Sequence, residues 1–290
     1  MLSLDHTLHS FKVSIVIPTY NRKLLLNNLL LSIEKSNYKP FEIIVIDQSN
    51  DDTYEYIKNN FPYVKIYKYK LKLGAYLARY FGAEYAKGDL IAYLDDDIIV
   101  TKNWLSNIVT LFERNNIGAV CSTIINPNKI YPPVKEDKLF RYLEANPNED
   151  QCEVEFGSEA GLVYRRSLLS EKMLDRKILG AGQVWGENIV ICKTIKKANY
   201  KIFYSPKAIL YHFPQSSGTS LNFSMSKIFY EFRNATYLAA KYQNESILLI
   251  IPMIVHQCLF AFRETINRKN PLIFYYSLKG IIYGFSLIFK

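Results

Sequence analysis

Short apolar runs alternate with longer amphipathic stretches over residues 1–125. Five runs have the length and the β-branched content of strands: 13–17, 41–46, 63–69, 90–94 and 117–125. Between them, residues 24–33, 73–86 and 104–112 repeat apolar side chains at helical spacing, and a shorter helix is expected to end near residue 60. This alternation predicts an α/β fold with a mostly parallel sheet sandwiched by helices.

Polar side chains follow three of the predicted strands at the point where each strand ends. They are Pro18, Thr19, Tyr20 and Asn21 after the first strand, Asp47 after the second, and Asp95, Asp96 and Asp97 after the run 90–94. In parallel sheets, ligands bind beyond the carboxyl ends of the strands. We therefore expect the three clusters to lie together at one edge of the sheet.

Three adjacent carboxylates repel one another unless a cation neutralises them. In extended backbone, Asp95 and Asp97 project to the same side. Two hard oxygen ligands on one side suit Mg²⁺ or Mn²⁺ carrying a diphosphate. A solvated acidic turn or a helix cap is the structural alternative.

Four further residues have both a functional and a structural interpretation. Asp47 could accept a hydrogen bond from a nucleobase, or Asp47 or Asp51 could cap the next helix. Arg79 could pair with a phosphate or with Asp95, or form a surface ion pair. Glu187, at the start of a helix expected over residues 187–198, could be a general base, although a helix N-terminus favours an acidic residue in any case. His212 could bind a metal ion or be structural.

The character of the chain changes after Pro214. Residues 126–152 predict a loop with a short helix near 138–143, and short strands and the helix at 187–198 complete a first domain over residues 1–215. Residues 216–290 form a helical tail with an amphipathic helix at 224–242. Its mostly apolar stretches 246–262 and 271–289 are at the lower edge of the length that spans a bilayer.

Positive charge concentrates in the last third of the chain. Residues 1–190 contain 23 Lys and Arg against 24 Asp and Glu, whereas residues 191–290 contain 13 against 3. The excess lies with apolar helices and not with a nucleic-acid-binding motif, so we expect no nucleic-acid partner. A basic, apolar tail favours association with an anionic membrane surface. A helical subdomain buried on the sheet is the alternative.

Cysteine spacing and the N-terminal residues indicate the cellular compartment in which we expect the protein. The four cysteines form no Cys-x-x-Cys pair, and the N-terminus lacks the apolar run of a secretory signal. We expect reduced thiols. We also expect the protein at the cytoplasmic face of the cell membrane, as a peripheral or tail-anchored protein.

The order of the motifs is more specific than any one of them. They are residues 16–22, 44–49, 74–79 with Gly82, 88–89, 93–97, 161–166, 186–188 with 193–200, and 204–212. This succession, over residues 12–213, resembles the family 2 glycosyltransferases, which have the GT-A fold. The resemblance implies a nucleotide-diphospho-sugar donor, a divalent metal ion and inversion at the anomeric carbon.

The resemblance also implies a role for each matching residue. Pro18, Thr19 and Tyr20 would line the nucleoside, and Asp47 would contact the base. Asp95 would lie near the ribose, with Asp96 and Arg79 also among the nucleotide contacts. Asp97 would hold the metal ion, His212 matches a histidine that faces the metal or the diphosphate, and Glu187 would be the catalytic base.

Two departures from the family pattern stand out. The acidic pair of the family usually has Asp at its second position and often uses it as the base, but here that position is Asn188. Glu187 is therefore our candidate base, with Glu159 as a substitute. Residues 48–50 stand where the family usually has an acidic, glycine-containing turn. The sequence therefore does not indicate which nucleotide binds.

These patterns predict a metal-dependent inverting glycosyltransferase that acts on a hydroxyl acceptor, a membrane- or lipid-linked glycan precursor. A nucleotide-sugar-binding pseudoenzyme without turnover is the alternative, and Asn188 motivates it. A dehydrogenase is disfavoured because no G-x-G-x-x-G follows the first strand. A phosphatase that uses Asp95 as nucleophile is disfavoured because its motif would follow the first strand.

Overall fold

The computed structural model describes residues 11–127, 129–136, 142–146, 150–178, 186–214, 225–242 and 250–289. The chain forms two compact units. The first comprises residues 1–72, 79–169 and 195–213, and the second comprises residues 73–78, 170–194 and 214–290. The second unit thus combines the C-terminal helices with segments that precede residue 215, and the domain boundary expected there remains a prediction.

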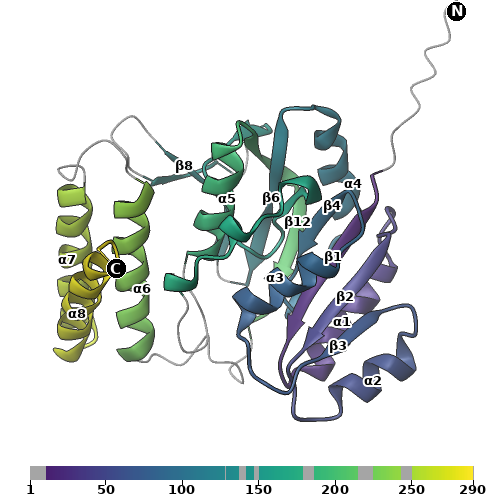
Figure 1. The fold of residues 1–290 in the computed structure, drawn as a ribbon, viewed down its shortest axis with the longest axis horizontal. Coiled ribbons are helices and arrows are strands. Elements are labelled where there is room, and N and C mark those ends of the chain that lie inside the picture. The colour runs from purple at the N-terminus through teal and green to yellow at the C-terminus, as the bar shows by residue number, and fades with distance from the viewer. Residues whose placement is uncertain are drawn as a thin grey trace, which may run out of the picture. The chain divides into compact units, whose positions relative to one another are not determined.

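The first unit is built on a ten-stranded sheet (Figure 1). Four of its strands pair in parallel, in the order β3-β2-β1-β4. Their bounds are Val13–Thr19 (β1), Glu42–Asp47 (β2), Lys65–Lys68 (β3) and Leu90–Tyr93 (β4). Strands β1, β2 and β4 are buried along their whole length, which explains why their sequences are near-continuous apolar runs.

The remaining strands extend the sheet beyond β4. Strand β11 (Val163–Arg165) runs antiparallel between β4 and β6 (Ile117–Asn126), and β12 (Lys201–His212) pairs in parallel with β6. Three short antiparallel strands complete it: β5 (Ile98–Val100) and β10 (Cys152–Glu153) beside β12, and β7 (Lys129–Tyr131) beside β6. Strands β1–β4, β6 and β12 share one direction, so the predicted mostly parallel sheet is confirmed.

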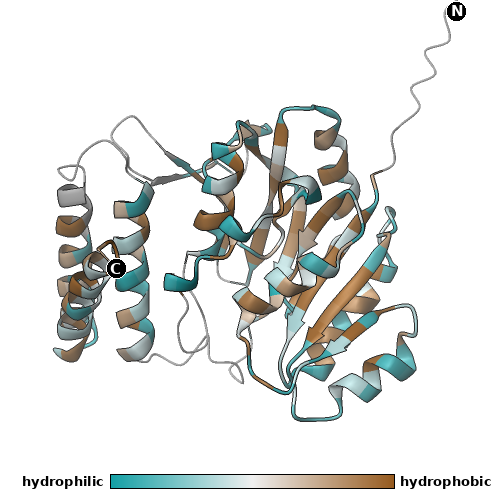
Figure 2. Cartoon of the chain, in the orientation of Figure 1, coloured by the Kyte–Doolittle hydropathy of each residue, from teal (hydrophilic) through white to brown (hydrophobic). Residues whose placement is uncertain are grey.

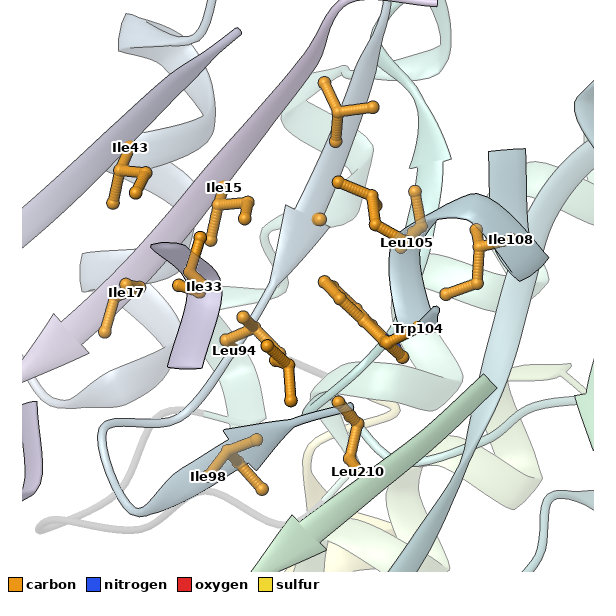
Figure 3. Close-up of a cluster of buried hydrophobic side chains, with 14 of the residues drawn as sticks. Ile15, Ile17, Ile33, Ile43, Leu94, Ile98, Trp104, Leu105, Ile108 and Leu210 are labelled. Carbon is orange, nitrogen blue, oxygen red and sulfur yellow. The ribbon is translucent and has the colours of Figure 1, made fainter. Parts of the chain in front are cut away.

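Helices cover both faces of this sheet, as expected. On one face, Ile15 and Ile17 of β1 pack in a core with Trp104 (Figure 3). Three helices contribute side chains to this core. These helices are α1 (Lys23–Glu34), α2 (Thr53–Asn60) and α4 (Trp104–Val109). On the other face, a Cβ on Gly82 of α3 (Ala75–Tyr85) would lie 2.3 Å from Cγ1 of Val16. Successive residues of β1 thus contact helices on opposite faces.

Two local expectations need correction. The helix expected over residues 104–112 is α4 followed by a 3-10 helix at Thr110–Glu113. Of the helix expected near residues 138–143, residues 138–141 lie outside the described part. The remaining two belong to strand β9 (Tyr142–Glu144), which pairs antiparallel with β8 (Val134–Glu136). That pairing is a contact between separate segments, which a local helical pattern cannot reveal.

The second unit is helical in its described residues. It contains 3-10 helices at Glu171–Met173 and Arg176–Ile178, the first residues of α5 (Glu187–Lys197), and three C-terminal helices. The latter are α6 (Met225–Tyr242), α7 (Ile250–Asn267) and α8 (Leu272–Ser286). They share an apolar cluster that includes Ile228, Phe232, Ala261, Ile273 and Ile281.

Helices α7 and α8 contain many hydrophobic residues, drawn brown in Figure 2. Many of these apolar side chains are exposed. On α7, Val255, Leu259, Phe262 and Ile266 recur at helical spacing, and each is more than half exposed. On α8 and just beyond it, the exposed residues include Leu272, Tyr275, Ile282 and Phe289. In the part of the chain that the structure describes, no helix combines the length and the apolar character that crossing a membrane requires.

Candidate functional site

Hydrogen bonds tie together the two turns that follow β1 and β2. The Gln48 N–H donates to the Thr19 carbonyl (3.1 Å), and the Asn21 N–H donates to Ser49 Oγ (2.8 Å). In return, the Asn50 N–H donates to Asn21 Oδ1 (2.8 Å). Asn21 has a φ of 53°, in the left-handed region that asparagine tolerates. The polar residues after these two strands therefore form one connected edge.

The acidic residues after β4 meet this edge through Arg22. Nη1 of Arg22 lies 2.9 Å from Asp96 Oδ1 and 3.2 Å from Asp97 Oδ2. Thr19 Oγ1 donates to Asp96 Oδ2 at 2.8 Å. Asp96 thus engages both of its oxygens within the protein, and both carboxylates are buried. The expected contact of Asp96 with a nucleotide remains a prediction.

Burial and neighbouring charges shift the pKa values of Asp96 and Arg22. Burial raises the pKa of Asp96, the Arg22 charge lowers it, and the Asp97 charge raises it again, with a net rise to about 7. Burial lowers the pKa of the Arg22 guanidinium, but Asp96 and Asp97 together raise it above its usual value. Arg22 is thus the cation that these two poorly solvated carboxyl groups share.

Pairing of β5 with β12 brings His212 to Asp97. His212 is opposite Ile98 in that antiparallel pair, and the Phe213 N–H donates to the Asp97 carbonyl (3.0 Å). Nε2 of His212 lies 3.3 Å from Asp97 Oδ1. Burial lowers the pKa of His212, but the hydrogen bond and charge of Asp97, with the Asp95 charge, produce a net rise. The two residues expected to bind a metal ion are thus in contact.

Arg79 of α3 pairs with Asp95. Its Nη2 donates to Asp95 Oδ1, as one of the alternatives for Arg79 expected, and the contact of Arg79 with a phosphate remains a prediction. Arg79 is buried, whereas the Asp95 side chain is 33% exposed. Asp95 is therefore the most accessible of the three adjacent aspartates.

Asp47 is fully buried at the end of β2. Its Oδ1 accepts the Ser49 N–H at 2.9 Å, so it stabilises its own turn and does not cap the next helix. The Thr53 N–H at the start of α2 donates instead to Asp51 Oδ1 (3.0 Å). Asp47 Oδ2 accepts no hydrogen bond from the described residues, and Nζ of Lys68 lies 3.5 Å from it.

Pro18 and Tyr20 flank Thr19 in the same turn. Pro18 is buried and pairs with Ile46 in the β1–β2 register. Tyr20 is half-buried, and Nζ of Lys72 lies 4.1 Å from the centre of its ring. An aromatic face and a cation thus stand beside the turn.

Glu187 belongs to the second unit. It is the first residue of α5 and is 1% exposed, and Asn188 follows it, half-buried. The substitute base, Glu159, is half-buried in the first unit, ahead of β11. The two glutamates thus belong to different units.

Sequence reasoning gave no role to Arg22 or Lys68. Arg22 directly follows the turn after β1, and Lys68 ends β3, beside Asp47 in the β2–β3 register. For Arg22, the signal available in the sequence was its position next to a predicted ligand-binding turn. Their partners depend on which strands are neighbours, which the sequence does not state.

Solved structures share this fold. The structure of GalNAc-T7 with UDP, GalNAc and Mn²⁺ aligns with a TM-score of 0.63 at 22% identity, over 81% of this chain and 49% of that chain. The structure of residues 1–349 of S. aureus TarS in complex with UDP-GlcNAc aligns with a TM-score of 0.59 at 19% identity, over 78% of this chain and 66% of that chain. The fold is therefore that of the GT-A glycosyltransferases.

The family model for glycosyl transferase family 2 matches residues 14–172, more than half of the chain. The chain therefore belongs to glycosyltransferase family 2, and the expected family and enzyme class are confirmed.

Similar proteins come from several bacteria. An uncharacterised glycosyltransferase of Haemophilus influenzae is 31% identical over 89% of this chain and 98% of its own length. A Campylobacter jejuni protein named GalNAc(5)-diNAcBac-PP-undecaprenol beta-1,3-glucosyltransferase is 27% identical over 58% of this chain and 56% of its own. The Escherichia coli glucosyltransferase WfgD, named for UDP-Glc and alpha-D-GlcNAc-diphosphoundecaprenol, is 30% identical over 41% of this chain and 49% of its own. The chain thus spans about half the length of the two glucosyltransferases.

Proposed function

We propose that the protein transfers a sugar from a nucleotide-diphospho-sugar to an acceptor hydroxyl, with inversion at the anomeric carbon and with a divalent metal ion. The contact between Asp97 and His212, beside the connected turns after β1 and β2, carries this proposal. The site is at the carboxyl ends of parallel strands, where such sheets bind ligands.

The nucleoside is proposed to bind along Pro18, Thr19 and Tyr20, with its base at Asp47. Asp47 Oδ2 supports this assignment because it is a buried acceptor without a hydrogen bond from the described residues. Nζ of Lys68, 3.5 Å away, offsets its charge, and a nucleobase N–H would supply the hydrogen bond that the oxygen lacks. Asp95, the most accessible of the three aspartates, is proposed to lie near the ribose.

Asp97 and His212 suit a divalent cation such as Mn²⁺ or Mg²⁺. A carboxylate oxygen and an imidazole nitrogen in contact can bind one ion together. Among the described residues, no group of three or more His, Cys, Asp and Glu side chains could hold a metal ion. Two protein ligands would leave the other positions around the cation to diphosphate and water. When bound, the cation would offset the negative charge that grows on the departing diphosphate.

Glu187 is proposed to take the proton of the acceptor hydroxyl. The hydroxyl oxygen forms a bond to the anomeric carbon while the bond from that carbon to the diphosphate oxygen breaks. Attack opposite the leaving group inverts the configuration. The neighbouring Asn188 has an amide and cannot accept this proton, so the role falls to Glu187 alone in that pair.

We propose a lipid-linked glycan precursor as the acceptor. The C. jejuni and E. coli relatives support this class, because their names place the acceptor sugar on undecaprenyl diphosphate. Such an acceptor resides at a membrane surface, which suits a protein at the cytoplasmic face of the cell membrane.

The C-terminal helices are proposed to bind that surface. The exposed apolar residues of α7, Val255, Leu259, Phe262 and Ile266, follow one helical stripe. Exposed basic residues accompany the apolar side chains of α7 and α8: Arg263, Lys269 and Lys279. Apolar side chains combined with cationic ones favour an anionic lipid interface.

Nucleoside diphosphate release tests the proposed activity. Full-length protein is incubated with a panel of nucleotide sugars, lipid extract as acceptor, and Mn²⁺, Mg²⁺ or chelator. We expect one sugar nucleotide to give metal-dependent release, which Asp97→Asn and Glu187→Gln each reduce by about 100-fold or more. Glu153→Gln, which changes a half-exposed carboxylate paired with Lys201, should retain activity.

The same assay addresses the alternative of a binding protein without turnover. Tight nucleotide binding with no release from any donor, in the presence of lipid extract, would contradict the transferase and support the pseudoenzyme. In that case Asn188→Asp should restore turnover if the missing carboxylate is the reason.

A further inference from the structure

Helix α6 contacts two backbone positions close to Glu187 in sequence. Nδ2 of the fully buried Asn234 donates to the Ile178 carbonyl at 3.0 Å. One helical turn further along, the buried Leu238 packs against Gly186, which directly precedes Glu187. Asn234 and Leu238 are thus on the same face of α6, as residues four apart are. All of these residues belong to the second unit.

Gly186 determines where α5 begins. Its carbonyl accepts the Val190 N–H at 3.2 Å, in the i to i+4 pattern of the first helical turn. Its φ is 101°, a conformation that glycine adopts at little cost. A Cβ built on Gly186 would lie 2.4 Å from Cδ1 of Leu238. Leu238 therefore occupies the space that the missing side chain leaves, and it limits where Gly186 and Glu187 can lie.

A second contact from α6 holds the segment around Asp175. Nζ of Lys241 lies 2.6 Å from Asp175 Oδ2. The Asp175 N–H donates to the hydroxyl of Tyr76 (2.8 Å), and that hydroxyl donates to the Met173 carbonyl (2.7 Å). Burial raises the pKa of Tyr76, the Asp175 N–H lowers it, and the Glu187 charge raises it again. Glu187 is thus close enough to influence this buried network.

We propose that α6 positions Glu187 for proton transfer, with Leu238 as the positioning residue. The inference rests on the proposed role of Glu187 as base. Leu238 is not expected to touch the reacting atoms, because it acts through Gly186, the residue that precedes Glu187. The C-terminal helices would then contribute to the transfer step itself, in addition to membrane association.

Steady-state kinetics of Leu238→Ala test this role in the full-length protein. We expect kcat for transfer to fall by about 10- to 100-fold, because misplacing a catalytic group by about 1 Å has an effect of this size. The donor KM and the Kd for the nucleoside diphosphate should stay within about twofold of the wild-type values, because the proposed nucleotide contacts are in the other unit. Leu238→Met, which preserves most of the side-chain volume, should recover most of the activity.

Ile273→Ala is the matched control. Ile273 is an equally buried aliphatic residue of the second unit, and it packs in the cluster that α6, α7 and α8 share. The substitution should loosen the C-terminal helices about as much while leaving kcat within about twofold of wild type. If Ile273→Ala lowers kcat as much as Leu238→Ala does, general loosening explains the loss and the positioning role is wrong. If Leu238→Ala does not fold, Leu238→Val, which removes less volume, is measured in its place and judged by the same kcat criteria.

Glu187→Gln separates this inference from the proposed function. If Glu187→Gln keeps wild-type kcat, the assignment of the base fails, and the positioning role fails with it. If Glu187→Gln is inactive and Leu238→Ala keeps wild-type kcat, only the positioning role fails. Loss in both variants, with the nucleotide Kd and the Ile273→Ala kcat unchanged, supports the proposal.

Discussion

Nη1 of Arg22 lies 2.9 Å from Oδ1 of Asp96, so the turn after β1 supplies the cation for the acidic residues after β4. The same nitrogen lies 3.2 Å from Asp97 Oδ2. One arginine thus compensates two buried carboxylates that are adjacent in the chain. Arg22, together with His212 beside Asp97, makes it tolerable to bury both carboxylates.

We predict that Arg22→Ala lowers the free energy of unfolding by about 3 kcal/mol, because it leaves buried carboxylates without their cation. Urea denaturation in the presence of chelator, followed by tryptophan fluorescence, measures the change. Lys201→Ala is the control, because it breaks a half-exposed pair with Glu153 and should cost less than about 1 kcal/mol. Equal losses in the two variants would contradict the importance of Arg22 to the buried cluster.

A second prediction concerns pH and Glu42 at the start of β2. Its carboxylate accepts hydrogen bonds from Ser14 Oγ, the Lys87 N–H and Lys65 Nζ, each at 2.6 Å. Burial raises the pKa of Glu42, but the hydrogen bonds and the Lys65 charge outweigh burial, and the net pKa is lowered. The Glu42 carboxylate therefore contributes its full stabilisation at pH values above the pKa that Glu42 has in the unfolded chain. This stabilisation is lost as the pH falls through the lower pKa of Glu42 in the folded protein.

Glu42→Gln should lower the free energy of unfolding by about 1 to 2 kcal/mol at pH 7, since it removes charge-assisted hydrogen bonds. Below about pH 4 the difference from wild type should shrink, because the wild-type carboxylate is then becoming protonated. Urea titrations at a series of pH values compare the two proteins. A difference that stays constant down to pH 3 would show that the charge of Glu42 contributes nothing.

Membrane association can be tested through the stripe on α7. Leu259 is 64% exposed, and replacing it and Ile266 with Glu places charge in the apolar stripe without filling a core position. We expect the double variant to lose most of its binding to vesicles that contain anionic lipid, measured by co-sedimentation. Leu24→Glu on α1, where the leucine is 69% exposed, should bind vesicles like the wild type. Undiminished binding of the α7 variant would show that this stripe is not the docking face.

The packing of α8 on α6 gives a fourth prediction. A Cβ on Gly284 would lie 2.5 Å from the Arg233 carbonyl oxygen and 2.7 Å from the Thr236 Cβ. Gly284→Ala should therefore destabilise the C-terminal helices by about 1 to 3 kcal/mol, although alanine usually favours a helix. Limited proteolysis detects the change as faster cleavage after residue 214. Ser286→Ala on the same helix should leave the cleavage rate close to wild type.

Much of the first unit could be predicted from the sequence, because its strands are buried on both faces. Continuous apolar runs such as 13–17 and 90–94 are hard to mistake, and each is followed by polar residues at the same edge of the sheet. The hairpin of β8 and β9 was missed for the opposite reason. Its strands are short, and the pairing of Val134 with Glu144 joins separate segments, so the local sequence shows little apolar–polar alternation.

The candidate site was predictable in its residue types but not in its contacts. Asp97 and His212 were both named as metal ligands, but their meeting depends on the antiparallel pairing of β5 with β12. Arg22 was part of a recognised motif, yet nothing in its sequence neighbours indicates Asp96 as its partner. Contacts between distant segments follow from strand order, which alternation of apolar and polar residues does not encode.

The pairing of β12 with β5 also has a consequence for the time course of folding. Strands β1 to β4 come from the N-terminal part of the chain and can pair soon after they are synthesised, whereas His212 is the last residue of β12. Asp97 therefore has no histidine beside it until β12 has joined both β5 and β6. Closing that long loop is the slow kind of step in sheet formation. A newly made chain would form the edge at the turns after β1 and β2 before it could bring together the two residues proposed to bind a metal ion.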